Sequence, residues 1–184
     1  MKAVWRTFVL FTMASTWLLA QTPQASAQAK KLTFGVDVAE DFTQFVFTPV
    51  HSTDVIPLRG SMFLTVGNVF PEGTIVGDGH DFDPNSSGSI GTWVCNGVML
   101  VDADQIPDAP IWVDTRQRFK LPDDSKSLTT DGFEGTAVQL RTVTGGTGEL
   151  QGYIGQEQQE FLGFNIVGGV NLRITFTLTK PGGK

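Results

Sequence analysis

The chain has 184 residues, with 13 lysines and arginines against 19 aspartates and glutamates, and a net charge of −6 at neutral pH. An acidic chain repels a phosphate backbone, and no basic stripe offsets the acidity, so the composition argues against nucleic-acid binding. Cys95 is the only cysteine, which excludes an intramolecular disulfide and leaves stability to packing and strand hydrogen bonds.

The first predicted element is a cleavable export signal. Lys2 and Arg6 form a basic region, an apolar run covers 8–20, and Ala25-Ser26-Ala27 supplies the small residues of a cleavage site. A transmembrane helix needs ~20 apolar residues, and this run is shorter. We therefore expect cleavage after Ala27, a secreted or periplasmic single domain of residues 28–184, and no membrane span after cleavage. Removing two of the basic residues would make the mature chain more acidic still.

The mature chain repeats with the two-residue period of β-strands and shows no helical apolar spacing. The clearest case runs from Val170 to Leu178, where apolar and polar residues alternate. Short strands punctuated by Gly, Pro and Asp predict an all-β fold, either a sandwich or a barrel. A single eight-stranded antiparallel β-barrel is favoured, because closure removes exposed edges. The predicted strands are Leu32–Val38, Phe42–Val50, Ser61–Phe70, Gly91–Val101, Ile111–Leu121, Thr136–Thr144, Gly152–Phe161 and Val170–Leu178.

Two long polar stretches, Pro71–Ser87 and Pro122–Asp131, are predicted to be loops within this one domain. The first contains the run Asp81-x-Asp83-x-Asn85, which is spaced like the start of a calcium loop. It lacks the glycine and the glutamate that the calcium motif requires, so an Asx-rich turn is the preferred interpretation. No metal site is expected.

A glycine-rich segment, Val143–Gln156, separates two predicted strands. Gly145, Gly146 and Gly148 can adopt the positive φ that hairpin turns and bulges require, so a structural turn is favoured over a binding loop. The segment lacks a Gly-Lys-Ser/Thr ending and runs into a strand, which argues against a nucleotide-binding loop.

Three segments in order resemble known families. Val143–Gln156 (VTGGTGELQGYIGQ) resembles the glycine-rich signature shared by plant allene oxide cyclases and dirigent proteins. Gly88–Gly97 resembles the aromatic-rich strand of the cyclases, and Ile174–Leu178 resembles the closing strand. The resemblance implies an eight-stranded antiparallel barrel with one cavity, which agrees with the strand count obtained from the pattern.

The resemblance implies one of two functions. Allene oxide cyclases close a ring in an unstable fatty-acid epoxide without a cofactor, and dirigent proteins steer the coupling of phenoxy radicals. By this resemblance we expect an exported, cofactor-free cyclase, isomerase or stereocontrol protein acting on a small apolar or phenolic molecule. The alternative is a non-catalytic module that binds a lipid-like or phenolic ligand or has a structural role. A homo-oligomer is compatible with both, and no catalytic residue is assigned.

The strand Gly91–Val101 supplies the main candidates for a ligand cavity. Alternation places Trp93, Cys95 and Met99 on one face of it. In an eight-stranded barrel one face of each strand points into a narrow lumen, where these three side chains would form a polarizable wall suited to an apolar ligand. Filling of a packed core is the alternative interpretation.

Four charged residues are further pocket candidates. Arg116 and Arg118 share a face of Ile111–Leu121 and would suit an anionic head group, although such a row more often forms a solvated outer face. Asp37 and Arg141 each interrupt an otherwise ordinary strand pattern. They bear on function only if they point into the barrel, where burial shifts a pKa.

Overall fold

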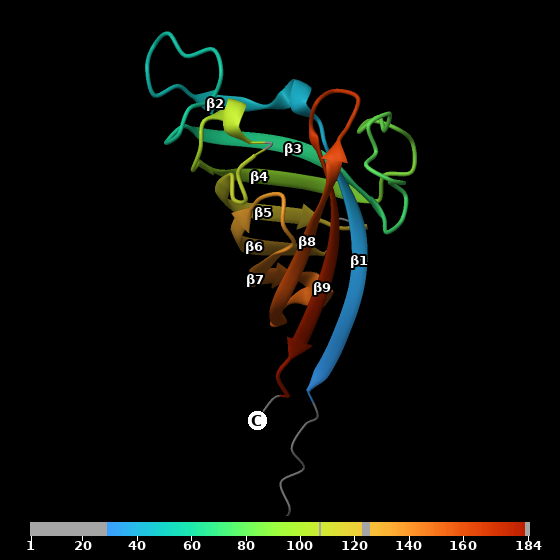
Figure 1. Ribbon diagram of the computed structural model, residues 1–184. Helices are drawn as coiled ribbons and strands as arrows, with labels where there is room; N and C mark the ends of the chain where they lie inside the picture. The colour runs from blue at the N-terminus through green and yellow to red at the C-terminus, as the bar shows by residue number, and fades with distance from the viewer. Residues whose placement is uncertain (1–28, 107, 123–125, 183–184) are drawn as a thin grey trace, which may run out of the picture.

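The computed structural model describes residues 29–106, 108–122 and 126–182, which form mainly β-strands (Figure 1). The predicted leader, residues 1–27, lies outside the described residues. Within the described ranges the helices are three single 3-10 turns, and none of them is long and apolar enough to cross a bilayer. These turns are η1 (Phe42–Gln44), η2 (Ala103–Gln105) and η3 (Gly148–Leu150). The strands are β1 (Lys30–Glu40), β2 (Val46–Thr48), β3 (Met62–Pro71), β4 (Gly91–Met99), β5 (Val113–Lys120), β6 (Ser127–Glu134), β7 (Gln139–Thr147), β8 (Ile154–Phe164) and β9 (Val170–Lys180).

Eight of these strands form a closed antiparallel ring. Their hydrogen-bonded order is β1-β9-β8-β7-β6-β5-β4-β3, and β3 closes the ring by pairing with β1 between Val36 and Glu40. The short β2 is an additional strand, which pairs with Met62–Leu64 of β3 beyond the point where β1 ends. The predicted all-β, eight-stranded antiparallel barrel is confirmed.

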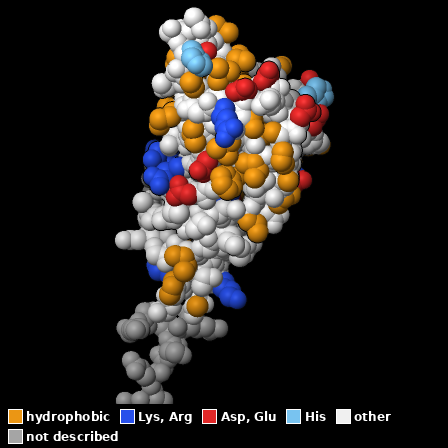
Figure 2. Space-filling model, turned by 60° about the vertical axis from the view of Figure 1, so that its left-hand side comes forward, with side chains coloured by type: hydrophobic (Ala, Val, Ile, Leu, Met, Phe, Trp, Pro, Cys, Tyr) orange, Lys and Arg blue, Asp and Glu red, His pale blue; other side chains and the backbone are white. Residues whose placement is uncertain are grey.

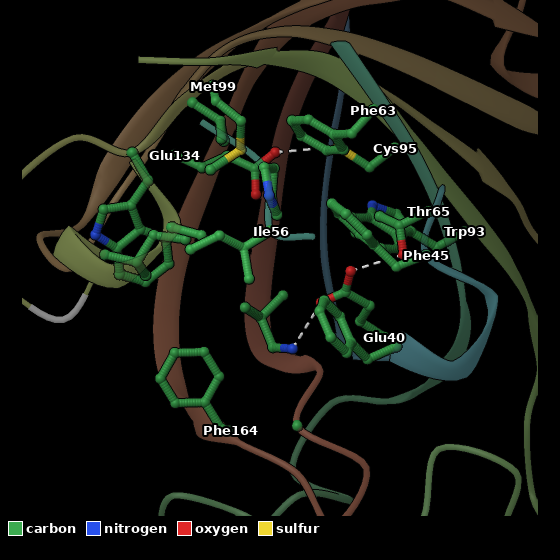
Figure 3. A pocket seen from close by; sticks show the side chains of 18 residues that line it. Glu40, Phe45, Ile56, Phe63, Thr65, Trp93, Cys95, Met99, Glu134 and Phe164 are labelled. Atoms are coloured by element: carbon green, nitrogen blue, oxygen red, sulfur yellow. Dashed lines mark hydrogen bonds between the residues drawn. The ribbon is translucent and has the colours of Figure 1, made fainter. Parts of the chain in front are cut away.

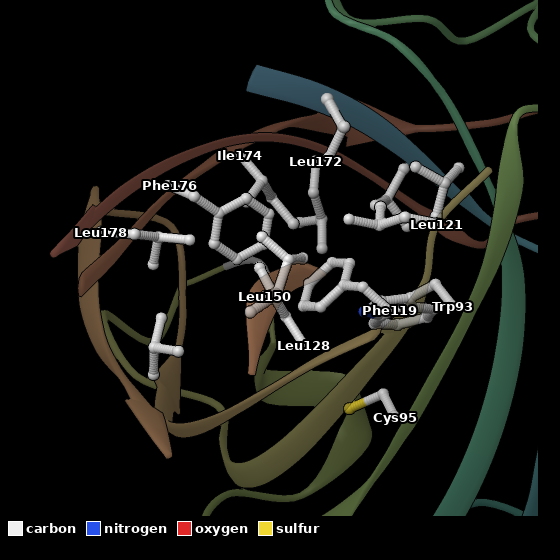
Figure 4. Packing of buried hydrophobic residues seen from close by; sticks show 14 of the residues in the cluster. Trp93, Cys95, Phe119, Leu121, Leu128, Leu150, Leu172, Ile174, Phe176 and Leu178 are labelled. Carbon is white, nitrogen blue, oxygen red and sulfur yellow. The ribbon is translucent and has the colours of Figure 1, made fainter. Parts of the chain in front are cut away.

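Alternate residues of the strands point into the ring and build its core. In β5, Val113, Thr115, Gln117 and Phe119 are buried, whereas the residues between them are exposed. The half of the lumen nearest the two ends of the described chain is filled by apolar side chains (Figure 4). Phe119 and Phe176 meet there edge to face, with ring centroids 5.1 Å apart. Around them pack Leu128, Leu150, Leu172, Ile174 and Leu178.

A second, smaller core lies outside the ring, under the segment 72–90. Asp37 is fully buried there, and Arg173 donates to both of its carboxylate oxygens at 2.9 and 3.2 Å. The N–H of Ile75 donates to the same carboxylate at 2.8 Å, and Ile75 packs with Phe70. This ion pair therefore fastens the segment 72–90 to the outer face of β1 and β9. The predicted loop Pro71–Ser87 is confirmed, since β3 ends at its first residue and no strand follows before β4.

The predicted loop Pro122–Asp131 is wrong, because its second half belongs to β6. Leu128 is the only apolar side chain that β6 points into the lumen, so its alternation is weak. The predicted strand Phe42–Val50 is also mostly wrong, since it contains η1 and only the three residues of β2. The two errors offset each other, which is why the predicted number of barrel strands is still correct.

The predicted turn at Gly145 and Gly146 is wrong as well, since both residues lie inside β7. Of the three predicted turn glycines only Gly148 has a positive φ, at 58°, and the turn continues to Gly152 at 79°. Gly146 is needed for a different reason. A Cβ there would lie 2.6 Å from the carbonyl oxygen of Leu150, whereas a Cβ at Gly145 would meet no atom within 4 Å.

This contrast gives a matched pair of substitutions. We expect Gly146→Ala to destabilise the protein by about 1–3 kcal/mol, because the new methyl group forces the η3 backbone outward. Gly145→Ala, one residue away on the same strand, should leave the free energy of unfolding unchanged or slightly higher. Urea unfolding of both variants provides the measurement, and equal destabilisation by the two changes would contradict the close approach.

Candidate functional site

A cavity of about 190 Å³ is lined by residues of η1 and η2 and of the ends of β1, β4 and β6 (Figure 3). In Figure 1, η1 and η2 lie at the end of the barrel away from the two ends of the described chain. The cavity forms where β1 stops at Glu40 and the chain turns outward through η1. Its polar lining residues are Glu40, Thr65 and Glu134. The rest of the lining is Phe42, Phe45, Ile56, Pro57, Phe63, Trp93, Cys95, Met99, Ala103, Ile106, Trp112, Val113, Phe164, Gly168 and Val170.

Aromatic rings make up much of the cavity wall. Phe45 stacks against Phe42 and Phe63, with ring centroids 5.0 and 5.5 Å away. On another wall, Phe161 meets both Trp112 and Phe164 edge to face, at 5.0 and 5.2 Å. Rings that pack against each other in this way hold their faces in fixed positions, so the cavity offers a preformed apolar surface to a ligand.

Trp93, Cys95 and Met99 all line this cavity, from the inward face of β4. Each is almost completely buried, with 1%, 1% and 3% of its surface exposed. Burial raises the pKa of the Cys95 thiol well above its usual value, and a thiol held neutral is a poor nucleophile. Cys95 therefore contributes a neutral S–H donor and apolar surface.

Glu40, the last residue of β1, places a carboxyl group in the cavity (Figure 3). The residue is only 5% exposed. Thr65 Oγ1 donates a 2.6 Å hydrogen bond to one carboxyl oxygen, and the N–H of Val170 donates one of 2.8 Å to the other. Burial nevertheless raises the pKa of Glu40 to about 7, because neither partner carries a charge that would stabilise the carboxylate.

The turn that joins β8 to β9 fixes the backbone of Glu40. Asn165 Nδ2 donates a 2.8 Å hydrogen bond to the carbonyl oxygen of Glu40, while Asn165 Oδ1 accepts from the N–H groups of Val167 and Gly169. A Cβ at Gly169 would lie 2.3 Å from that same carbonyl oxygen. Glycine at this position is therefore what allows the turn to close onto the end of β1.

Glu134, the last residue of β6, is the second carboxyl group of the cavity. Its Oε1 accepts hydrogen bonds from Thr115 Oγ1 and, at 3.3 Å, from Cys95 Sγ. Arg141 Nη1 lies 3.7 Å from the same oxygen. Both carboxyl groups therefore accept hydrogen bonds, but of the two it is Glu134 that has an opposite charge close to it.

A chain of neutral side chains connects Trp93 to Glu134 across the lumen. Trp93 Nε1 donates to Gln117 Oε1 at 3.1 Å, and Gln117 Nε2 donates to Gln159 Oε1 at 2.7 Å. Gln159 Nε2 then donates to Glu134 Oε2 at 3.4 Å. Each amide is oriented by its neighbour, so the chain fixes the carboxyl group of Glu134 relative to the indole ring.

Arg141 points into the barrel and lies behind this layer, with 1% of its surface exposed. Its guanidinium donates to three main-chain carbonyl groups of β5 and β6, at 2.9, 3.1 and 3.1 Å. Its Nε lies 3.5 Å from Oε1 of Glu157, which is fully buried. Burial raises the pKa of Glu157 to about 7, although the charge of Arg141 acts in the opposite direction. The guanidinium of Arg141 thus interacts with main-chain carbonyl groups and with the carboxyl groups of Glu134 and Glu157, all of which belong to the barrel.

The remaining predicted pocket candidates lie outside the cavity. Arg116 and Arg118 project from the outer face of β5, where Arg116 Nε donates to Asp131 at 2.8 Å. Asp37 lies in the small core outside the ring. The structure therefore brings Trp93, Cys95 and Met99 together, with Arg141 behind them, and separates these three charged residues from the site.

Sequence reasoning missed both carboxyl groups of the cavity. Glu40 follows Val36 and Val38 on the inward face of β1. A charged residue at the next inward position of a strand is the sequence feature that could have identified it as a site residue. Glu134 ends a strand that was predicted as a loop in its first half. In the ring order, β1 and β6 are four strands apart in either direction, so the two carboxyl groups face the cavity from opposite walls.

No protein-family model matches the chain, and no curated protein matches it in sequence. Solved structures do match. The pterocarpan synthase dirigent protein PsPTS1 gives a TM-score of 0.56 at 13% identity, over 86% of this chain and 99% of its own. A second such protein, GePTS1, gives 0.56 at 10% identity, over 85% and 92%. This chain has the fold of the dirigent proteins. Pyocyanin demethylase shares that barrel, with a TM-score of 0.52 at 16% identity, over 80% of this chain and 99% of its own. The barrel expected from the dirigent resemblance is confirmed at the level of fold.

The raised pKa of Glu40 makes a prediction about the stability of this dirigent-type barrel. The folded protein holds the Glu40 proton up to about pH 7, whereas the ordinary value is 4.5. The contribution of Glu40 to the free energy of unfolding is therefore fully present below pH 4.5, the ordinary pKa. It is lost as the pH rises to about 7, the pKa in the folded protein. Relative to Glu40→Gln, the wild type should lose roughly 3 kcal/mol between about pH 4.5 and pH 7.

Urea unfolding of both proteins across this pH range provides the measurement. Glu157 titrates in the same direction but is present in both proteins, so the difference between them isolates Glu40. A difference in the free energy of unfolding that stays constant with pH would show that the Glu40 carboxyl titrates normally.

Proposed function

We propose that this protein binds a small, mainly apolar molecule in the cavity at the barrel mouth and catalyses an acid–base isomerisation or cyclisation of it without a cofactor. The observation that carries the proposal is Glu40, a buried carboxyl group with a pKa of about 7 that lines an otherwise aromatic and aliphatic cavity. A group of this pKa is present in both protonation states near neutral pH, which is the condition for efficient proton transfer in either direction.

Glu134, on the opposite wall of the cavity, supports a mechanism in which the two carboxyl groups have different roles in proton transfer. Glu134 has an arginine 3.7 Å away, whereas Glu40 has only neutral hydrogen-bond partners. Two carboxyl groups in different environments on either side of a ligand can exchange a proton with two different atoms of it. The rigid aromatic wall would hold the ligand in one conformation between them, which lowers the entropic part of the barrier.

The names of the structural neighbours favour a catalyst over a purely structural module. One is named as a demethylase of pyocyanin and two as pterocarpan synthases. Barrels of this shape therefore include proteins that act on small organic molecules. Transfer of such a role to this chain rests on the cavity and its carboxyl groups, since the identities are too low to carry it.

The proton-transfer role can be tested with 5-nitrobenzisoxazole, a small aromatic probe. A base removes its C3 proton, the N–O bond breaks, and the released cyanophenolate is followed by its absorbance. We expect the rate to rise with pH around the pKa of about 7. Glu40→Gln should lower it by ~10²-fold, the typical contribution of a positioned general base.

Two further measurements complete this test. Glu160→Gln, on the same barrel but exposed to solvent, is the matched control and should keep the wild-type rate. Binding of the neutral dye N-phenyl-1-naphthylamine, followed by its fluorescence, reports whether the cavity of each variant is intact. Equal rates for wild type and Glu40→Gln, with dye binding retained, would remove the acid–base role. The non-catalytic ligand-binding alternative would then be the better description.

We also propose that the protein acts after export, on the basis of the leader-like sequence at residues 1–27. Intact-mass analysis of protein recovered from outside the cytoplasm should give a mature chain that begins at Gln28. A full-length chain that fractionates with membranes would contradict this localisation.

A further inference from the structure

The described lining of the cavity contains acidic but no basic side chains, and this indicates the class of ligand. Of the eighteen described residues that line it, two are glutamates and none is lysine, arginine or histidine. Six are aromatic: Phe42, Phe45, Phe63, Trp93, Trp112 and Phe164. Carboxyl groups combined with the faces of aromatic rings are the usual surroundings of a bound organic cation.

The two glutamates differ in how far the protein compensates them. Glu134 has Arg141 3.7 Å away, and that arginine also lies close to Glu157. Glu40 receives hydrogen bonds only from a hydroxyl group and a main-chain N–H. The charges that act on Glu40 most strongly are those of Glu134 and Asp41, and both are negative. Among the described residues, no positively charged group is one of the main influences on the pKa of Glu40.

Three further acidic residues are direct sequence neighbours of lining residues. Asp41 follows Glu40 directly, and Asp102 and Asp104 flank Ala103 of the cavity lining. Figure 2 shows acidic and basic side chains among hydrophobic ones on the part of the surface away from the grey chain end. The described lining itself, which is apolar apart from Thr65 and two carboxyl groups and contains no basic residue, is what favours a cation over a carboxylate.

We propose that the natural ligand of this cavity is a small aromatic or otherwise apolar molecule that carries a cationic nitrogen, and that Glu40 is its counter-ion. The proposal rests on the proposed function, because it assigns a substrate class to the same site. It distinguishes this protein from a binder of fatty acids or other carboxylates, which would place a second negative charge beside Glu40. A bound cation would place a positive charge beside Glu40 and would thereby favour the carboxylate form of this residue.

Three probes that share the 1-naphthylmethyl group and differ in charge test the preference. They are (1-naphthylmethyl)trimethylammonium, the neutral 1-naphthylmethanol, and 1-naphthylacetate, with affinities measured by calorimetry. At about pH 8, where Glu40 is ionised, we expect the cation to bind about tenfold more tightly than the alcohol, and the anion to bind most weakly. At about pH 5.5 the preference for the cation should largely disappear, because protonated Glu40 carries no charge.

Glu40→Gln provides the second measurement. It should abolish the preference for the cation at every pH while the alcohol still binds, and Glu160→Gln should leave the preference unchanged. Equal affinity for all three probes, or tightest binding of the anion, would overturn the cationic-ligand proposal and leave the proposed function standing. Failure of every probe to bind to folded wild-type protein would instead overturn both, since the cavity would then not be a binding site.

Discussion

The pairing of β1 with β3 is the constraint on which both the barrel and its cavity depend. It closes the ring, and it also ends at Glu40, which lies opposite Gly67. A Cβ at Gly67 would lie 2.4 Å from the carbonyl oxygen of Ala39, so only glycine lets the two strands cross there. Beyond this point the chain leaves the ring through η1, while β3 continues with β2 beside it. The cavity exists because one strand of the wall stops before its neighbours do, and Glu40 is the residue at which it stops.

A layer of polar side chains lies between two parts of the lumen, one of which is packed and the other open. On one side lies the apolar cluster around Phe119 and Phe176, which is packed to exclude ligand and water. On the other side lies the open cavity. Between them, Gln117 donates a hydrogen bond to Gln159, and Gln159 donates one to Glu134. Arg141 forms ion pairs with Glu134 and Glu157. Such a layer is costly to bury, and replacing it with apolar residues would often be neutral or stabilising. What it supplies is a fixed orientation for the side chains that form the cavity floor.

The sequence predicts the parts of this protein that follow apolar alternation and misses those that interrupt it. Alternation places Trp93, Cys95 and Met99 on one face of β4, but both faces are largely apolar, and it is the structure that shows this face to be the inward one. β6 was missed because the lumen positions after Leu128 are Thr130, Gly132 and Glu134, which fit a loop equally well. Glu134, the last of these residues, accepts a hydrogen bond from the polar layer and lines the cavity. Local rules fail here for a physical reason: a functional lumen needs polar groups where a strand pattern needs apolar ones.

The fold does not need the charge of Glu40. Both of its hydrogen-bond partners are neutral donors, and the desolvation that raises its pKa to about 7 is a penalty on the ionised form. An amide at this position could accept from the Thr65 hydroxyl without that penalty. By contrast, Arg173 and Asp37 form an ion pair outside the ring, where each compensates the other and together they hold a loop. A buried ion pair has a structural explanation of that kind. Glu40 has hydrogen bonds to Thr65 and Val170 but no such ion pair among the described residues, which is why we propose that a ligand supplies the complementary charge.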